Sequence, residues 1–137
     1  MTTSMRRLMP VLMLAAAAAC HDSSTGPVNT VVGTYALATV NAQALPYQFT
    51  LSTGEKLTLN SDIVTLREDG TYSDIGKWTS STAGAFTVTE VGTYSETNGT
   101  VMFFDQTDGI TYQGTLAGSV LTESSGNMTQ VYQKVEL

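Results

Sequence analysis

The chain has 137 residues, a formal net charge of −6, one cysteine and one histidine. This length supports one domain rather than two, and a hydrophobic content of 42% is enough for a real core. A single cysteine excludes a disulfide within the chain, and a single histidine leaves no room for a zinc site with several nitrogen or sulfur ligands. The acidic balance, without a basic patch, makes nucleic acid an unsuitable partner.

The first segment of the chain has the pattern of an export signal. Arg6 and Arg7 precede an apolar run at residues 8–19. As a helix this run would reach about 18 Å, which is too short for the roughly 30 Å of a bilayer core but typical of a signal peptide. The run ends in three alanines and a cysteine, namely Ala17, Ala18, Ala19 and Cys20.

Small residues directly before a cysteine resemble the lipobox of bacterial lipoproteins. This resemblance implies that residues 1–19 are cleaved as a signal peptide and that Cys20 receives a diacylglycerol; an ordinary signal peptide with an unrelated cysteine is the alternative. Two or three acyl chains give a stable anchor, so the exported protein is expected in the cell envelope. In enterobacterial lipoproteins an Asp directly after the cysteine retains the protein at the inner membrane. His21 stands there, which favours the outer membrane where an organism has both.

Residues 20–30 are expected to form the lipidated cysteine and a flexible polar tether, and residues 31–137 an all-β domain. Segments rich in Thr, Val, Tyr, Phe and Ile alternate with turn dipeptides such as Asp69-Gly70 and Asn98-Gly99, at the spacing of an antiparallel meander. The predicted strands span residues 33–41, 57–60 running on through 63–68, 71–79, 85–95, 100–105, 110–117, 119–123 and 128–135.

Eight consecutive strands with short hairpins predict an antiparallel up-and-down barrel, which removes both edges of the sheet. An open or sandwich-like β domain is the alternative. Residues 43–49 are expected to form a turn or a short lid, because Pro46 breaks any longer element.

Two motifs at the start of this domain, GTYAL at residues 33–37 and VNAQALP at residues 40–46, resemble the opening of small bacterial lipocalin-like lipoproteins. These proteins commonly begin G-T-aromatic-x-L and continue V-N-G-x-x-L-P. Here Ala42 stands in place of the usual glycine, and Tyr35 stands where larger lipocalins carry tryptophan. The resemblance covers roughly residues 31–135. It implies a lipocalin-like β-barrel.

Alternation along the predicted strands directs one set of aromatic and apolar side chains into the barrel. The set comprises Tyr35, Leu37, Tyr72, Trp78, Phe86, Val88, Phe103, Tyr112, Leu116 and Tyr132. These residues either fill the interior as a core or line a cavity in which tyrosine hydroxyls orient a ligand. We expect a filled core, because so small a domain leaves little spare interior.

Several carboxylates, among them Asp105 and Asp108, are interpreted as turn residues, with Ca²⁺ ligation as the alternative for these two. We expect no catalytic residue, metal or cofactor, and hence no enzyme.

Two functions remain open. One is a membrane-anchored module that binds a small apolar or amphipathic ligand, and the other is a non-catalytic envelope protein that acts through its outer surface. The expected partners are membrane lipid, through the acyl anchor, and the ligand; the chain is expected to be a monomer.

The lipobox interpretation predicts that Cys20→Ala prevents lipid attachment, because only the cysteine thiol can carry a thioether-linked diacylglycerol. Labelling cells with a radioactive fatty acid should mark the wild-type protein and a Ser23→Ala control but not the Cys20→Ala variant. Label in the Cys20→Ala protein would show that the lipobox interpretation is wrong.

Overall fold

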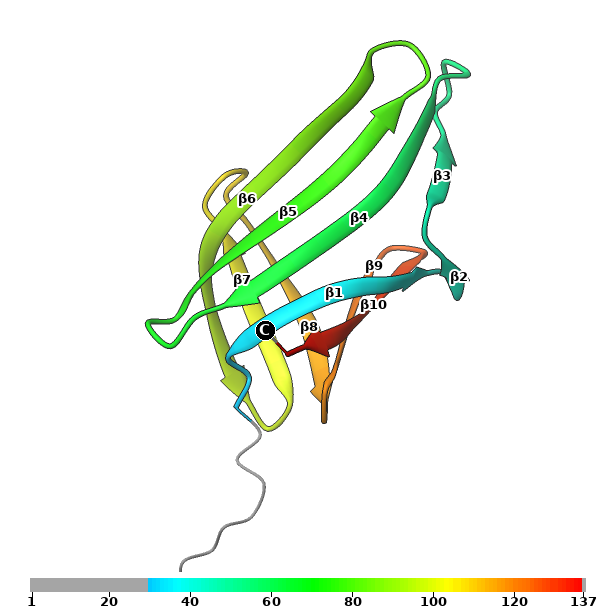
Figure 1. The fold of residues 1–137 in the computed structure, drawn as a ribbon. Helices are drawn as coiled ribbons and strands as arrows, with labels where there is room; N and C mark the ends of the chain where they lie inside the picture. The colour runs from blue at the N-terminus through cyan, green and yellow to red at the C-terminus, as the bar shows by residue number, and fades with distance from the viewer. Residues whose placement is uncertain (1–29, 137) are drawn as a thin grey trace, which may run out of the picture.

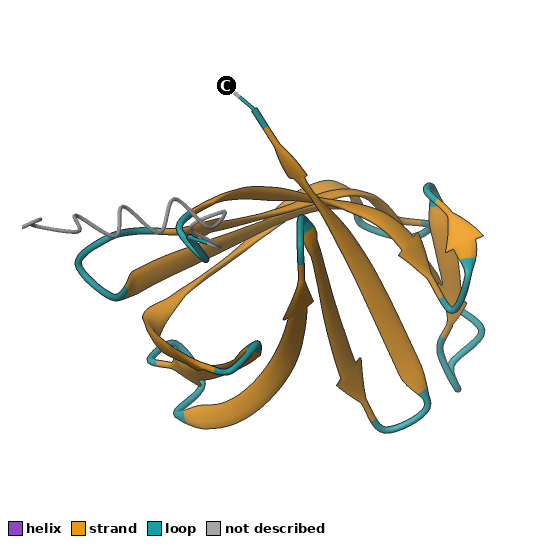
Figure 2. Ribbon diagram, turned by 90° about the horizontal axis from the view of Figure 1, so that it is seen from below, coloured by secondary structure: helices purple, strands orange, loops and turns teal. Residues whose placement is uncertain are grey.

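The computed structural model describes residues 30–136, so the predicted signal peptide, Cys20 and most of the predicted tether lie outside the described residues. Within them the chain consists of β-strands and their connections (Figures 1 and 2). The strands are β1 (Gly33–Val40), β2 (Gln43–Ala44), β3 (Tyr47–Thr50), β4 (Lys56–Leu66), β5 (Thr71–Ser80), β6 (Gly84–Thr97), β7 (Thr100–Asp105), β8 (Ile110–Ala117), β9 (Val120–Ser125) and β10 (Met128–Val135). Residues 30–136 contain no helix of the length and apolarity that a membrane crossing requires.

Eight of these strands form a closed antiparallel ring. The ring follows the order β1, β4, β5, β6, β7, β8, β9 and β10, and it closes because β1 pairs with both β10 and β4. Leu37 lies opposite Tyr132 on one side of β1, and Tyr35 lies opposite Val64 on the other. The predicted eight-stranded antiparallel up-and-down barrel is therefore confirmed, and every strand of the ring has a neighbour on each side.

The connection between β1 and β4 forms two short strands that the sequence analysis does not predict. β2 pairs with the end of β1, and β3 pairs with the first part of β4. β1 reaches β4 only through residues 33–36, and beyond this point the two strands diverge (Figure 1). The segment expected as a turn or short lid thus runs along the resulting gap. We call the end that carries the β5–β6 turn the upper end, and the end that carries the β4–β5 turn the lower end, as drawn in Figure 1.

The β1–β2 turn keeps its hairpin geometry without the glycine that the resemblance leads one to expect. Asn41 and Ala42 both have positive φ angles, 49° and 63°. The Asn41 side chain holds the turn in place, because its Oδ1 accepts a hydrogen bond from the Thr129 amide at 2.8 Å.

The lower half of the barrel is filled by apolar side chains. The fully buried residues include Tyr35, Leu66, Tyr72, Val101, Phe103 and Leu121. Tyr72 meets Phe103 edge-on with ring centroids 5.1 Å apart, and Phe103 stacks on Tyr112 at 4.9 Å. The Tyr35 hydroxyl donates a hydrogen bond to the Val31 carbonyl at 2.6 Å. These contacts make the lower half of the barrel a packed core.

β6 changes its partner along its length. It pairs with β5 as far as Thr93 and with β7 from Gly92 onward. At Gly92 an added Cβ would lie 1.9 Å from the backbone oxygen of Phe104, so the absence of a side chain is what allows β7 to approach. Val91 is still hydrogen-bonded to Gln106 and Thr107 of the β7–β8 turn, and above Val91 no β7 residue pairs with β6.

Gly92→Ala is expected to lower the free energy of unfolding by about 3 kcal/mol or more, because the clash is with the backbone of a neighbouring strand and no rotamer change relieves it. Thr89→Ala, on the exposed face of the same strand, should cost about 1 kcal/mol or less. Urea denaturation followed by circular dichroism measures both. Equal losses in the two variants would contradict this account of β6.

Candidate functional site

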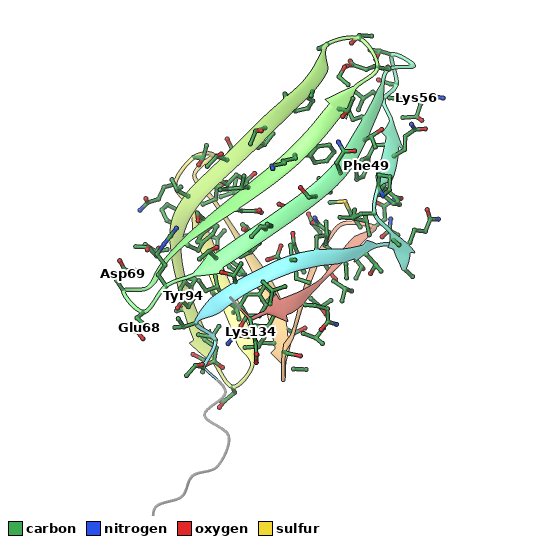
Figure 3. The ribbon with its side chains drawn as sticks, in the orientation of Figure 1. Phe49, Lys56, Glu68, Asp69, Tyr94 and Lys134 are labelled. Carbon is green, nitrogen blue, oxygen red and sulfur yellow. The ribbon has the colours of Figure 1, made fainter. Side chains whose placement is uncertain are left out.

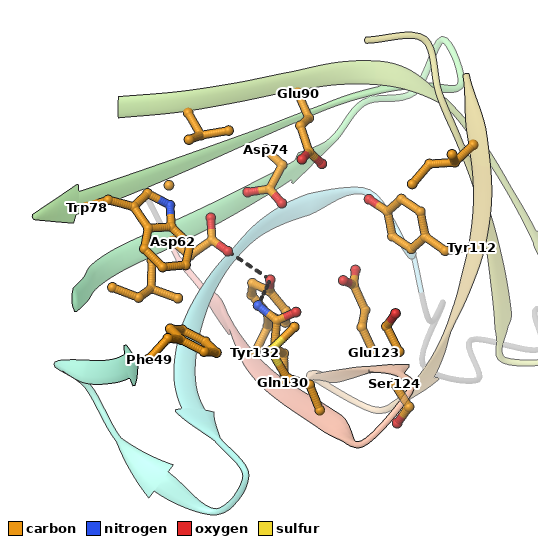
Figure 4. A pocket seen from close by; sticks show the side chains of 16 residues that line it. Phe49, Asp62, Asp74, Trp78, Glu90, Tyr112, Glu123, Ser124, Gln130 and Tyr132 are labelled. Atoms are coloured by element: carbon orange, nitrogen blue, oxygen red, sulfur yellow. Dashed lines mark hydrogen bonds between the residues drawn. The ribbon is translucent and has the colours of Figure 1, made fainter. Parts of the chain in front are cut away.

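The upper half of the barrel is hollow. A cavity of about 290 Å³ lies there, and its lining residues come from β3, β4, β5, β6, β8, β9 and β10 and from the residues that flank them (Figure 4). Ligand pockets in proteins begin at roughly this size, about 300 Å³. The expectation of a filled core is therefore wrong for the upper half of the barrel, although it holds for the lower half.

The mouth of the cavity is aromatic and apolar. Trp78 lies between Phe49 of β3 and Phe86 of β6, with ring centroids 5.6 Å and 6.4 Å away; the Phe86 ring is nearly parallel to the indole. Phe49 points inward from the segment that bridges β1 and β4 (Figure 3). Further apolar lining comes from Leu59, Val88, Ile110 and Met128. An apolar group that enters from the upper end would meet these side chains first.

Four carboxylates line the same cavity below this mouth (Figure 4). They are Asp62 of β4, Asp74 of β5, Glu90 of β6 and Glu123 of β9, and we call them the acidic floor. Asp62 is only 7% exposed and Glu123 only 8%. Asp74 and Glu90 are directly opposite each other in the β5–β6 pair, an arrangement that is unfavourable for like charges.

The local backbone explains how Asp62 reaches the interior. A register shift between Leu59 and Ser61 interrupts the alternation of β4, so Leu59 and Asp62 both face inward. Gly76 lies opposite Asp62 on β5. A Cβ at Gly76 would lie 2.7 Å from Trp78 Nε1, so the glycine leaves space between the indole and the floor.

The acidic floor has few hydrogen-bond donors. Tyr132 donates its hydroxyl to Asp62 Oδ2 at 3.0 Å, and Gln130 Nε2 donates to the Tyr132 hydroxyl at 3.2 Å. Oxygens of three floor residues, Asp62 Oδ1, Asp74 Oδ1 and Glu123 Oε1, are buried without a hydrogen-bond partner among the described residues. Buried polar groups usually find partners, and unpaired ones are costly.

Burial raises the pKa of three of these carboxyl groups, those of Asp74, Glu90 and Glu123. It raises the pKa of Asp74 to about 10, and hydrogen bonding to Asp62 and the charges around it add to the effect. Burial also raises the pKa of Glu123 to about 8, with contributions from Asp62 and Glu90, and raises the pKa of Glu90. At neutral pH Asp74 is therefore expected to hold its proton. Strongly shifted groups in a cavity are typical of functional sites.

No basic residue lines this cavity among residues 30–136. These residues include Lys56, Arg67, Lys77 and Lys134, and none of the four contributes to the lining. Lys134 lies at the lower end of the barrel, where its ammonium group donates to the Thr30 carbonyl at 2.7 Å and lies 5.6 Å from the Tyr35 ring centroid (Figure 3). The negative charge of the acidic floor thus has no positive partner within this part of the chain.

The residues Asp105 and Asp108, considered above as turn residues or Ca²⁺ ligands, lie beside this site. Asp105 Oδ1 accepts a hydrogen bond from the Thr107 amide at 2.7 Å, which supports the turn interpretation. Carboxylate oxygens of Glu90, Asp105 and Asp108 also lie within 4.8 Å of one another, and Asp105 Oδ2 is buried without a partner among the described residues. The negative field of the acidic floor therefore extends to the β7–β8 turn.

The structure divides the predicted interior set between core and cavity. Tyr35, Leu37, Tyr72, Phe103 and Tyr132 are buried, Leu116 packs against the core, and Trp78, Val88, Tyr112 and Tyr132 line the cavity. Phe86 and Val88 face inward but are each 40% exposed, because they lie on the part of β6 that extends above β7. Their exposure fits the alternative of a cavity lining better than that of a filled core.

Comparison with known proteins identifies a solved structure that is similar to this chain. No protein-family model matches the chain, and no curated protein matches it. Among solved structures, the chain is similar to the crystal structure of a lipocalin-like protein from Bacteroides uniformis, with 15% sequence identity and a TM-score of 0.45 over 76% of this chain and 97% of that one. Independently of that likeness, the eight antiparallel strands in up-and-down order form a closed barrel of the architecture that lipocalins have.

The raised pKa values make stability depend on pH. Asp74 and Glu123 have pKa values near 4 in an unfolded chain and of about 10 and about 8 in the barrel. Between these limits the folded barrel keeps protons that the unfolded chain has released, so the free energy of unfolding falls as pH rises. We expect the melting temperature to fall from pH 5 to pH 8.5.

Two amide variants test the assignment of this slope. Asp74→Asn and Glu123→Gln should each raise the melting temperature at pH 8.5 and flatten its dependence on pH. Glu68→Gln, at an exposed position of the β4–β5 turn, changes the net charge equally and should leave the slope unchanged. A wild-type melting temperature that stays constant or rises over this range would contradict the buried acidic floor.

Proposed function

We propose that this lipocalin-like barrel is the ligand-binding domain of a lipoprotein anchored in the cell envelope, and that it takes up a small amphipathic molecule through its upper end. The observation that carries the proposal is the cavity of about 290 Å³ with an apolar mouth and a polar floor, above a filled lower half. Concave, mostly apolar sites with a few polar groups are the usual form of small-molecule sites.

The chemistry of the lining favours binding over catalysis. The titratable side chains that line the cavity are carboxylic acids and tyrosines, and residues 30–136 contain neither histidine nor cysteine. We therefore propose a binding protein and not an enzyme. The anchor rests on the lipobox-like Ala17-Ala18-Ala19-Cys20, which would hold such a binding domain at a membrane surface.

Native mass spectrometry of the full chain purified from its own membranes tests the proposal. The wild-type protein is expected to retain a non-covalent molecule that denaturation releases, whereas the covalent acyl groups stay attached. Val88→Phe places a larger side chain inside the cavity and should reduce this retained mass strongly. Thr89→Phe adds the same side chain on the exposed face of β6 and should leave it unchanged.

Two outcomes would contradict the proposal. One is a wild-type protein without any releasable mass. The other is a retained mass that both variants keep equally. Either result would favour the alternative, in which a non-catalytic envelope protein acts through its outer surface.

A further inference from the structure

We infer that the ligand is a cation: the acidic floor receives the ammonium group of a small organic amine, and the apolar part of that amine lies against Trp78 and the mouth. This inference rests on the proposed function and specifies the chemical class of the ligand. It follows from the position, burial and unmatched charge of the four floor residues.

The first observation is the position of the four acids of the floor. Asp62, Asp74, Glu90 and Glu123 belong to four different strands, yet they converge on one cavity (Figure 4). Asp62 and Glu123 are more than nine-tenths buried, and each has a side-chain oxygen without a hydrogen-bond partner among the described residues. These oxygens are free acceptors. An ammonium group carries only donors, so it complements them, whereas a carboxylate or phosphate ligand would add acceptors and negative charge.

Charge balance points to the same ligand class. Isolated buried charges are costly unless they are paired or neutralised. Among the described residues no lysine or arginine lines the cavity, so the floor can become neutral only by holding protons or by taking up a cation from solution. In the barrel without a ligand, bound protons neutralise the acidic floor, as the raised pKa values of Asp74 and Glu123 indicate.

The aromatic and apolar side chains at the mouth determine which kind of cation fits the cavity. Above the floor the lining is aromatic and aliphatic, with Trp78 between Phe49 and Phe86. A hydrated inorganic ion would leave these surfaces exposed, whereas an amine with an aromatic or short alkyl group would cover them. The cavity size restricts the ligand to a small amine.

Proton exchange should accompany binding. At least one acid or phenol faces the interior from every strand of the ring: Tyr35, Asp62, Tyr72, Asp74, Glu90, Tyr94, Asp105, Tyr112, Glu123 and Tyr132. A bound ammonium group favours the ionised form of its neighbours, so binding should release protons to the buffer. Affinity should therefore rise with pH until the amine itself loses its charge.

Three probes of the same shape and different charge test the inference: 2-phenylethylammonium, 2-phenylethanol and 3-phenylpropanoate. Each is titrated into the full chain in phosphatidylcholine nanodiscs, with empty nanodiscs as the blank. Calorimetry and Trp78 emission report binding. We expect 2-phenylethylammonium to bind at least tenfold more tightly than 2-phenylethanol, and 3-phenylpropanoate not to bind. Calorimetry in two buffers of different ionisation enthalpy should show proton release with the ammonium probe only.

Isosteric variants assign the effect to the floor. Asp62→Asn and Glu123→Gln should each weaken binding of 2-phenylethylammonium at least tenfold and leave 2-phenylethanol within about twofold. Glu68→Gln removes one exposed negative charge and should change neither probe. Melting temperatures confirm that each variant is folded, and the unchanged affinity for 2-phenylethanol reports an intact cavity in the same titration.

The outcomes separate this inference from the proposed function. If 2-phenylethanol or 3-phenylpropanoate binds as tightly as the ammonium probe, the cationic ligand is wrong and the binding function stands. If Ca²⁺ alone binds and excludes 2-phenylethylammonium, the acids form a metal site and the inference is overturned. If none of the three probes binds and the purified protein retains no ligand, both the inference and the proposed function fail.

Discussion

The double pairing of β1 is the constraint on which the rest of the structure depends. Its hydrogen bonds to β10 and to β4 turn an eight-stranded meander into a ring and enclose an interior. The contact with β4 involves only residues 33–36, at the lower end, where the tyrosines, leucines and Phe103 pack into a core. Higher up, β1 diverges from β4 and β7 stops below the end of β6, so the upper half stays open. The same closure therefore produces a filled half and a hollow half.

A second consequence of closure is the confinement of acids. Side chains that would be solvated in an open sheet face one another across a closed barrel. Asp74 and Glu90 are direct cross-strand neighbours, and Asp62 and Glu123 approach from the other walls. Such an arrangement costs stability, which the packed lower half offsets, and costly polar groups that persist in a cavity are characteristic of functional sites. In our proposal a cationic ligand supplies the missing partner, so binding and stabilisation of the barrel become linked.

Most of the fold could be predicted from local patterns. The eight predicted strands correspond to β1 and β4–β10 with ends that differ by a few residues, because β-branched and aromatic runs between Asn-Gly and Asp-Gly dipeptides are a direct signal of hairpins. β2 and β3 were missed, since strands of two and four residues around Pro46 are too short to show alternation. The role of Asp69 as a turn residue was also predictable from the sequence. Its Oδ1 accepts hydrogen bonds from the Thr71 amide at 3.0 Å and from the Thr71 hydroxyl at 2.6 Å.

The candidate site was only partly encoded in those patterns. Alternation places Asp74 on the face of Tyr72 and Trp78, and Glu90 on the face of Phe86 and Val88. This signal was present in the sequence, but the sequence analysis, which interpreted the carboxylates mainly as turn residues, did not predict these two acids as part of a site. The sequence by itself could not place Asp62, because the register shift in β4 changes the alternation there. Nor could it bring Glu123 to the same cavity. Strand periodicity specifies the face on which a side chain lies. Only the closed barrel, through the lengths and registers of its strands, decides which faces meet, how far apart they stay, and how much space remains between them.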